Sequence, residues 1–314
     1  MTNLRVLHLV TAEEVFFRQQ ISTLESKGVR CDICVVPGAD QIDGDMASQR
    51  GIREYLQYLP KVQKAVRGGD YDILHANYGL TIPFAAMQFQ HPVVATLWGS
   101  DVIGLDGLVT RLFSRRPDAI TVRSTEMREL LGREDAYIIP SGIDMDLFQP
   151  LDQTAARQHV QWDLNDLHVL FPYSPDYKRK NYSLAEKVVE QVQEEFDRTI
   201  HLQTISGVDH SEMPNYMNAS DALLLTSSHE GSPNTVKEAM ACNVPVVSTD
   251  VGDVRSRLEG VTPSGVGSTK TELAKQLHSV LRSQERSNGR EKVVEVSWDH
   301  IGDQIIDIYR TVLP

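Results

Sequence analysis

Residues 221–253 contain a strand, a loop, a helix and a second strand in one continuous pass. Ala222–Leu225 is a short apolar run, which is typical of a parallel strand covered on both faces. Small and polar residues follow at 227–232, a composition that suits a loop whose backbone approaches a ligand. A further apolar run at 244–247 predicts the next strand. Because parallel strands need such a crossover, the stretch predicts an α/β fold.

The helix between these strands has recognisable ends. Pro233 and Asn234 open it, because proline suits a first turn in which its missing N–H would have had no helical partner. The helix continues to Ala241, and Asn243 can close it because asparagine tolerates the left-handed backbone conformation. The helix N-terminus therefore points out of the carboxyl edge of the sheet. Free N–H groups and the helix dipole make this place an anion site, and a diphosphate is the usual anion.

Two carboxylates frame this anion site. Glu230 lies in the loop, and Glu238 lies in the helix that follows. Carboxylates accept hydrogen bonds from hydroxyl groups, so the pair suits a sugar or a ribose better than the phosphate itself. The alternative interpretation is a pair of surface glutamates on an ordinary α/β unit.

The same alternation of strands and helices runs through the rest of the chain. Its length of 314 residues allows two α/β domains of roughly 150 residues each. No G-x-G-x-x-G fingerprint of a dinucleotide-binding fold occurs. We expect further strands at 4–10, 31–36, 72–76, 93–98, 119–123, 137–140, 168–173 and 199–205, and helices at 16–27, 52–67, 183–195 and 213–218.

Charge and cysteine content narrow the classes of partner and compartment. The net charge is −12, which argues against nucleic acid as the main partner. No run of 18 or more apolar residues and no signal-peptide pattern occurs, and three cysteines cannot form a disulfide framework. We expect a cytoplasmic protein. Cys31 and Cys34 are read as strand residues, because a zinc site would need a second pair and only Cys242 remains.

Several phrases of the sequence resemble one enzyme family. Glu230 and Glu238 have Glu-x7-Glu spacing inside EGSPNTVKEAMACNVPVVSTDVGD, and SDALLLTSS precedes them. Together these resemble the donor-site signature of retaining GT-B glycosyltransferases of the family 4 type. AITVRSTEMRELL and YIIPSGIDMDLFQP resemble the end of the first domain and the linker of that family, and DILHANYG and ATLWGSD resemble two of its cleft loops.

The resemblance implies a fold and a domain plan. We expect two Rossmann-like domains whose parallel sheets face a central cleft: an N-terminal acceptor domain at 1–145 and a nucleotide-sugar donor domain at 146–296. The amphipathic segment 297–314 resembles the terminal family helix, which crosses back to the first domain.

The resemblance also assigns roles at the donor site. It implies that Glu238 holds the ribose hydroxyls and that Glu230 meets the sugar hydroxyls. Lys180 would neutralise the donor diphosphate, with Lys178 or Arg179 in place of an arginine that the family has soon after the strand and that this chain lacks. Glu230 and Lys180 are thus the predicted catalytic residues, although neither is identified as a nucleophile. The backbone amides of Gly231, Ser232, Pro233 and Asn234 are expected beside the sugar and phosphate, except that proline has no N–H.

The predicted reaction is hexosyl transfer from a nucleotide sugar to an acceptor hydroxyl with retention of anomeric configuration. Positive side chains and helix N–H groups would take the place of a metal, so we expect no metal and no other cofactor. Asp-x-Asp pairs occur at Asp43–Asp45 and at Asp144–Asp146, in a polar loop and in the linker, and we interpret both as chance.

The first half of the chain departs from the family pattern. Trp98 stands where the family commonly has a histidine before Gly99, Ser100 and Asp101, and it is read either as a stacking face for a sugar or as a core aromatic residue. His75 is a further cleft candidate or a structural histidine. The loop after the first strand has Thr-Ala-Glu-Glu at 11–14 where the family often has two glycines.

These departures keep other functions open. A non-catalytic nucleotide-sugar-binding partner subunit is the main alternative, and a nucleotide-sugar epimerase is a weaker one. The acceptor is expected to be a glycan, a lipid-linked molecule or a small molecule. Arginines gather over residues 111–128 (Arg111, Arg115, Arg116, Arg123 and Arg128). We interpret them first as a set of solvated charges, and an anionic membrane surface at the inner face is the alternative partner.

Overall fold

The computed structural model describes residues 4–38 and 51–314. The chain divides into two compact units, of which unit 1 comprises residues 1–142 and 298–314 and unit 2 comprises residues 143–297. Each unit is built on one sheet in which every pair of neighbouring strands is parallel. The predicted fold class, two α/β domains with parallel sheets, is confirmed.

The sheet of unit 1 has six strands in the order β2-β1-β3-β4-β5-β6. β1 and β3 lie inside it, and their apolar side chains are buried, as expected for strands covered on both faces. β2 lies at an edge, and Cys34 is its one buried residue. The strands are β1 (Arg5–Val10), β2 (Arg30–Val35), β3 (Ile73–Asn77), β4 (Val93–Thr96), β5 (Ala119–Val122) and β6 (Tyr137–Ile138).

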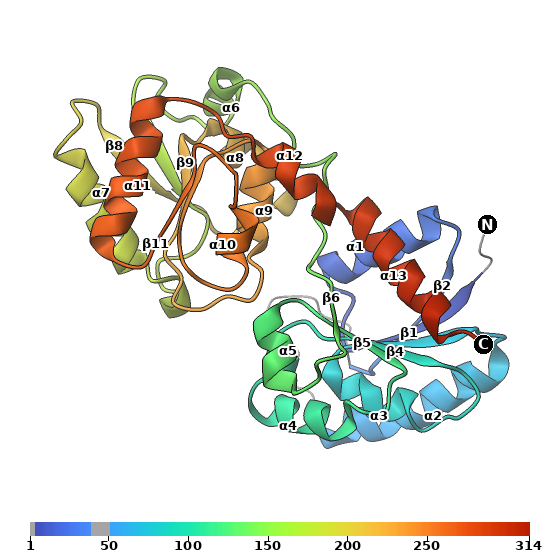
Figure 1. The fold of residues 1–314 in the computed structure, drawn as a ribbon. Coiled ribbons are helices and arrows are strands. Elements are labelled where there is room, and N and C mark those ends of the chain that lie inside the picture. The colour runs from blue at the N-terminus through green and yellow to red at the C-terminus, as the bar shows by residue number, and fades with distance from the viewer. Residues whose placement is uncertain (1–3, 39–50) are drawn as a thin grey trace. The chain divides into compact units, whose positions relative to one another are not determined.

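Helices cover both faces of this sheet (Figure 1). α1 (Val15–Ser26) and α13 (Trp298–Val312) pack together on one face, and α2 (Ile52–Gly68), α3 (Ile82–Ala85) and α4 (Gly104–Phe113) lie along the other. The larger core lies on the α2 side, where Tyr58 and Val62 pack against Leu7 and Leu9 of β1. α5 (Thr125–Leu131) follows β5 and adds Met127 and Leu131 to the same core.

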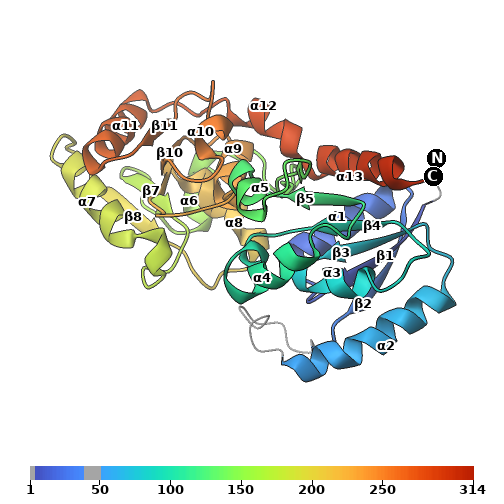
Figure 2. The same cartoon turned by 60° about the horizontal axis from the view of Figure 1, so that its bottom comes forward.

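The C-terminal helix α13 belongs to unit 1 and packs beside α1 (Figure 2). Ile301, Ile305 and Ile308 recur at helical spacing and are buried. Tyr309 of the same helix places its hydroxyl 2.6 Å from Nδ1 of His75 in β3. A fully buried hydrogen bond thus joins the end of the chain to the centre of the first sheet.

Unit 2 repeats the plan with five strands in the order β11-β10-β9-β7-β8. Leu224 of β9 and Val169 of β7 pack with Leu273 and Leu277 of α11 in one continuous core. The strands are β7 (Leu167–Phe171), β8 (Ile200–Thr204), β9 (Ala222–Leu225), β10 (Val246–Thr249) and β11 (Gly265–Gly267). The helices are α6 (Gln153–His159), α7 (Tyr182–Gln193), α8 (Met213–Ala219), α9 (Asn234–Ala241), α10 (Val254–Arg257), α11 (Lys270–Ser283) and α12 (Gly289–Val293).

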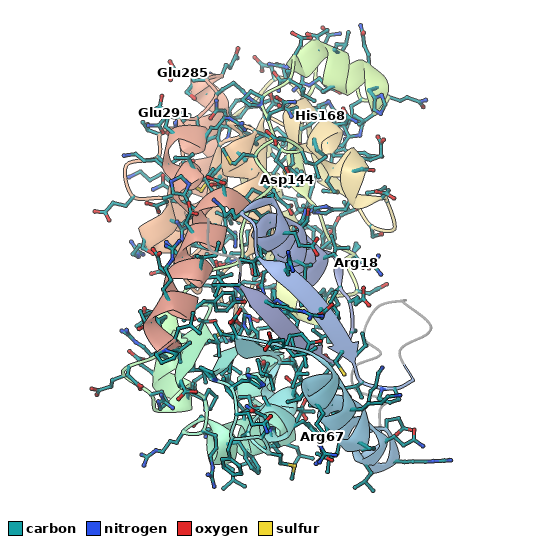
Figure 3. All side chains as sticks on the ribbon, turned by 90° about the vertical axis from the view of Figure 1, so that its right-hand side faces the viewer. Arg18, Arg67, Asp144, His168, Glu285 and Glu291 are labelled. Carbon is teal, nitrogen blue, oxygen red and sulfur yellow. The ribbon has the colours of Figure 1, made fainter. Side chains whose placement is uncertain are left out.

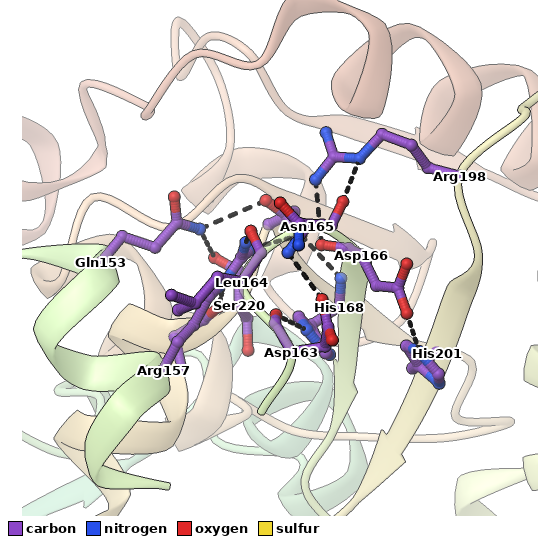
Figure 4. Close-up of polar contacts among 12 residues, drawn as sticks. Gln153, Arg157, Asp163, Leu164, Asn165, Asp166, His168, Arg198, His201 and Ser220 are labelled. Atoms are coloured by element: carbon purple, nitrogen blue, oxygen red, sulfur yellow. Dashed lines mark hydrogen bonds and ion pairs between the residues drawn. The ribbon is translucent and has the colours of Figure 1, made fainter. Parts of the chain in front are cut away.

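The amino-terminal edge of the second sheet is closed by a polar network (Figure 4). Asp221, which precedes β9, accepts hydrogen bonds from the backbone N–H of His168 at 2.6 Å and from Nη2 of Arg157 at 2.7 Å. The His168 ring is hydrogen-bonded to the carbonyl of Asp163, and His201 is paired with Asp166 at 2.8 Å. These groups satisfy one another, so this edge is structural and the opposite, carboxyl edge remains for a ligand.

Charged side chains lie on the outside of both units, for example Arg67 at the end of α2 and Glu285 after α11 (Figure 3). Among residues 4–38 and 51–314, no helix combines the length and the apolar character that crossing a membrane requires.

Candidate functional site

The loops that follow β7, β9 and β10 meet at the carboxyl edge of the unit 2 sheet, because parallel strands end at the same edge. Hydrogen bonds tie the loops together. The Thr226 hydroxyl donates to the carbonyl of Lys180 at 3.0 Å, and the backbone N–H of Ser228 donates to the carbonyl of Arg179 at 2.9 Å. The backbone N–H of Asp253 donates to the carbonyl of Gly231 at 3.1 Å. The sequence-predicted donor residues of the β7 and β9 loops are thereby held in one place beside the β10 loop.

Lys180 and Glu230 form a buried ion pair at the centre of this edge. Nζ of Lys180 lies 2.6 Å from Oε1 of Glu230, and the whole residues are 5% and 8% exposed. The Ser227 hydroxyl donates to the same Oε1 at 2.7 Å. Burial is the main influence on the lysine and lowers its pKa, while the bond to Glu230 opposes that effect. The two predicted catalytic residues are therefore in direct contact, which the sequence had not indicated.

Tyr173 stands where the family arginine is missing, and it supports Lys180. Nζ of Lys180 lies 3.7 Å from the centroid of the Tyr173 ring, a cation–π geometry. The Tyr173 hydroxyl is 2.7 Å from Oγ1 of Thr235 in the first turn of α9. Burial raises the pKa of this phenol, so it stays neutral. Tyr173 thus connects the cation to the helix N-terminus.

The helix α9 begins at Asn234 as predicted, and its capping position, Pro233, supplies no side-chain hydrogen bond. Its first-turn N–H groups are therefore the kind that a ligand can satisfy. Oδ1 of Asn234 is buried without a hydrogen-bond partner among the described residues. After the helix, Asn243 has φ +55°, the left-handed conformation expected of it.

Glu238 lies on α9 and is 4% exposed. Nε2 of His210 is 3.1 Å from Oε1 of Glu238, and this hydrogen bond is the largest cause of the raised pKa of His210. His210 begins the short 3-10 helix before α8, and α8 packs beside α9, which carries Glu238. No motif marks His210, and sequence reasoning missed it for that reason.

The Gly231–Ser232 turn is fixed by a second set of contacts. The Ser232 hydroxyl donates to Oδ2 of Asp253 at 2.8 Å, and Nζ of Lys237 donates to Oγ of Ser232 at 3.3 Å. Lys237 is 1% exposed and is a second buried cation that sequence reasoning did not single out. A Cβ on Gly252, which has φ +55°, would lie 2.2 Å from the carbonyl oxygen of Gly231. Only glycine fits at 252, because the backbones of the β9 and β10 loops lie too close together for a side chain between them.

The remaining basic candidates of this loop lie at the surface. Lys178 and Arg179 are exposed, and the Arg179 guanidinium donates to the Tyr177 hydroxyl at 2.8 Å. Neither side chain is hydrogen-bonded to Glu230 or Glu238 in the part of the chain that the structure describes. They border the buried pair without entering it.

In unit 1, the structure gives the candidates at the ends of β3 and β4 different surroundings. Trp98 is half-buried, and the Arg123 guanidinium lies 3.8 Å from its ring centroid. Asp101 is fully buried and accepts from the backbone N–H groups of Trp98 and Gly99 at 2.9 and 2.8 Å, while Ser100 is exposed. Asp101 therefore shapes the loop, and Ser100 and one side of Trp98 face outward.

His75 and Arg123 are both enclosed in the core of unit 1. His75 is fully buried with both ring nitrogens hydrogen-bonded, to Tyr309 and to Thr96, so none of its ring atoms faces solvent. Burial lowers the pKa of Arg123 to about 9. The expectation that Arg123 belongs to a surface basic zone is wrong, because it is 4% exposed under Trp98.

The described part of the chain contains no group of three or more His, Cys, Asp or Glu residues placed to hold a metal ion. Asp144 uses Oδ1 to accept from the backbone N–H groups of Asp146 and Leu147, an arrangement that stabilises a turn. The other Asp-x-Asp pair, Asp43 and Asp45, lies outside the described residues. Burial raises the pKa of Cys31 to about 12, so its thiol is not poised for metal or redox chemistry.

Two family models match the chain. The model for glycosyl transferases group 1 matches residues 178–283, and the model for Glycosyltransferase Family 4 matches residues 14–147. The MMP alpha-(1->4)-mannosyltransferase of Mycolicibacterium hassiacum is 23% identical over an alignment that covers 79% of this chain and 72% of that protein.

Solved structures show the same fold at low identity. A sucrose-phosphate synthase from Thermosynechococcus elongatus superposes with a TM-score of 0.74 at 18% identity, and the alignment covers 98% of each chain. Anabaena HepE in complex with UDP-glucose superposes with a TM-score of 0.68 at 15% identity, and the alignment covers 98% of this chain and 100% of that one. The sequence resemblance is thus confirmed, and the chain is a glycosyltransferase with the GT-B fold that belongs to the group 1, family 4 glycosyltransferases.

Proposed function

We propose that the carboxyl edge of unit 2 binds a nucleotide sugar and that the enzyme transfers its hexose to an acceptor hydroxyl with retention of configuration. The observation that carries the proposal is the buried Lys180–Glu230 pair beside the N-terminus of α9, with Glu238 further along the same helix. A hexose donor is supported by two similar proteins, a mannosyltransferase and a protein solved with UDP-glucose.

Each group in this arrangement has a role that its chemistry suits. Lys180 and the N–H groups of α9 stabilise the negative charge that develops on the leaving nucleoside diphosphate. Oε1 of Glu230 already binds Lys180 and Ser227, so its other oxygen is the one that meets a sugar hydroxyl. Glu238 holds the ribose hydroxyls, and His210 orients its carboxylate by the 3.1 Å bond to Oε1.

Transfer is proposed to need no metal. A buried lysine and a helix N-terminus supply the positive potential that a divalent ion supplies elsewhere. The exposed Lys178 and Arg179 add cationic charge at the border of the site. The acceptor is a glycan, a lipid-linked molecule or a small molecule with a free hydroxyl, and the enzyme acts in the cytoplasm.

One observation favours a second function, the binding of a nucleotide sugar without transfer. Trp98 replaces the family histidine, and the Arg123 guanidinium covers one face of its ring. A transferase that lost its sugar-contacting histidine would keep the donor site of unit 2 and lose the reaction. No comparable feature favours an epimerase.

Calorimetric titration with UDP-, GDP- and ADP-hexoses, with and without chelator, tests the proposal. We expect one donor to bind in both conditions, Glu238→Ala to abolish binding and Glu291→Ala, an exposed glutamate of the same unit, to leave it unchanged. Released nucleotide is measured in the same samples, and the anomeric configuration of any product is read by NMR.

The possible results separate the alternatives. Binding without nucleotide release, across a panel of sugar and lipid acceptors, assigns the chain to the non-catalytic class. A free epimer without acceptor indicates an epimerase. Absence of binding by every donor refutes the donor site, and loss of binding with chelator refutes metal independence.

A further inference from the structure

The helix α4 of unit 1 exposes its large apolar side chains and buries small ones, which is the reverse of an ordinary surface helix. Its buried positions are Gly107 and Thr110, whereas its large apolar residues face solvent. Leu105 is 82% exposed, Leu108 60% and Leu112 77%. A surface helix normally buries its apolar stripe against the core. Contiguous exposed apolar residues of this kind mark an interaction site.

Close packing holds α4 in this orientation. A Cβ on Gly107 would lie 2.5 Å from the backbone of Val102, and a Cβ on Gly79 would lie 1.8 Å from Oγ1 of Thr110. No larger side chain fits between α4 and the elements beneath it, so the helix cannot rotate to bury its leucines. The apolar residues Ile103 and Val109 extend the outward face and are 54% and 36% exposed.

The charges next to this face are almost all positive. Residues 103–116 contain Arg111, Arg115 and Arg116 against a single acidic residue, Asp106, in a chain of net charge −12. Asp106 accepts a hydrogen bond from the Tyr78 hydroxyl at 3.0 Å. The three arginines are exposed, and none forms an ion pair with a carboxylate in the part of the chain that the structure describes.

We propose that the outward face of α4, defined by Ile103, Leu105, Leu108, Val109 and Leu112 with Arg111, Arg115 and Arg116, docks on an anionic lipid surface. The leucines would enter the boundary between headgroups and acyl chains, and the arginines would pair with the phosphates above it. Apolar insertion and basic attraction are the two signals that peripheral binding combines.

The charge pattern selects a membrane over a second copy of this chain. A two-fold dimer through α4 places the same patch on both sides of the interface. Two copies would bring six arginines and two aspartates to one interface, and this excess of like charge opposes association. An anionic bilayer meets the same arginines with opposite charge.

Docking through α4 also has a consequence for the acceptor. α4 starts three residues after Asp101, the end of the Trp98–Asp101 loop, and packs on the short 3-10 helix Ser100–Val102. A bilayer bound at α4 lies next to this candidate acceptor loop, so the acceptor class that fits is a lipid-borne one. This last step rests on the proposed function, whereas the docking itself does not.

Flotation of the full chain with vesicles tests the docking at low salt. We expect binding to vesicles of 70% phosphatidylcholine and 30% phosphatidylglycerol and little binding to phosphatidylcholine alone. The triple variant Leu105→Ser/Leu108→Ser/Leu112→Ser should lower the partition coefficient roughly 10-fold or more. Its matched control is Leu56→Ser/Leu151→Ser/Leu164→Ser, three leucines exposed elsewhere on the chain, which should bind as the unmodified protein does.

The basic residues are tested by Arg115→Ala/Arg116→Ala, for which we expect a fall of about 30-fold in partition, near fivefold for each charge. The double variant Lys270→Ala/Lys275→Ala removes the same charge from exposed positions of unit 2 and should have no effect. Salt at about 0.5 M should weaken binding of the unmodified chain.

Three results would overturn the proposal. The first is no binding to anionic vesicles, and the second is equal binding to neutral and anionic ones. The third is concentration-dependent dimerisation in sedimentation that the triple serine variant abolishes, because it would assign α4 to an interface between copies. Nucleotide-sugar binding is measured on the same variants, so a failure of docking is distinguished from a failure of the donor site.

Discussion

Removing either partner of the buried Lys180–Glu230 pair should destabilise unit 2 strongly and to different degrees. Breaking a buried ion pair leaves an uncompensated charge and typically costs ~3–5 kcal/mol. Lys180→Met leaves Oε1 of the Glu230 carboxylate with the Ser227 hydroxyl as its hydrogen-bond donor. Glu230→Gln leaves Lys180 against the Tyr173 ring, 3.7 Å from its centroid, and a desolvated cation–π contact contributes ~2 kcal/mol.

Lys180 has a second way to avoid an unpaired charge. Burial lowers its pKa, so without Glu230 it can release its proton more readily than an ordinary lysine. We therefore expect Lys180→Met to cost ~4 kcal/mol and Glu230→Gln to cost ~2 kcal/mol of the unfolding free energy of unit 2. The double variant Lys180→Met/Glu230→Gln should cost less than the sum of the two, with a coupling of at least ~2 kcal/mol.

Hydrogen exchange in increasing urea measures these values. Peptides from β7, β9 and α9 report unit 2, and peptides from β1 and β3 of unit 1 serve as the internal control in the same sample. Additive single effects, or a larger loss for Glu230→Gln than for Lys180→Met, would show that the ion pair and the Tyr173 contact do not stabilise the site as the geometry implies.

Two further predictions concern a buried histidine and a loop glycine. Burial lowers the pKa of His8 to about 3 from 6.5. The His8 ring therefore stays neutral in the folded state, while it gains a proton in the unfolded state below pH 6.5. The free energy of unfolding should fall as the pH drops toward 3, by ~2 kcal/mol at pH 5. Thermal unfolding at several pH values should show this loss of stability. His8→Asn keeps a polar atom for Asn77 and should reduce the pH dependence. An unchanged pH dependence in this variant would show that His8 does not cause it. Gly252→Ala should destabilise unit 2 and lower donor affinity more than Gly207→Ala, because both positions have positive φ but only at 252 does the Cβ meet the Gly231 carbonyl. If the two alanine variants lose the same unfolding free energy and the same donor affinity, backbone strain alone accounts for the effect.

Local patterns predicted four strands and three helices of unit 2 with small errors at their ends, whereas β11 and the helices α6, α10, α11 and α12 were not predicted. The helix expected to end at Ala241 does so, and Asn243 has the positive φ expected of a closing asparagine. These features depend on residues next to one another, where capping and propensity decide the conformation. The parallel arrangement also followed from the alternation of strands and helices.

Contacts between loops could not be predicted in the same way. Lys180 and Glu230 are 50 residues apart, and they meet because β7 and β9 are neighbours in the strand order β11-β10-β9-β7-β8. His210 reaches Glu238 because α8, which His210 precedes, packs beside α9. Charge and spacing carry no information on strand order, so neither pair was visible in the sequence.

The α4 helix shows a different limit of pattern reading. Leucines at 105, 108 and 112 have the spacing of a core-facing stripe, yet Gly107 and Thr110 form the buried side. The apolar stripe tells which residues share a face, and only the structure tells whether that face is covered. Arg123 is the converse case, because a charged residue grouped with its surface neighbours in sequence lies in the core.

The contacts of the proposed donor site also show where its positive potential would come from. Lys180 is shared with Glu230, so it supplies only part of the positive potential that a bound diphosphate needs. The remaining positive potential must come from the α9 N–H groups, which lack a side-chain cap at Pro233, and from cations that border the pair. Oε1 of Glu230 stays on the lysine, and this leaves its second oxygen for a neutral hydroxyl. A site built in this way favours a ligand that brings hydroxyl groups and an anion together, which is the composition of a nucleotide sugar.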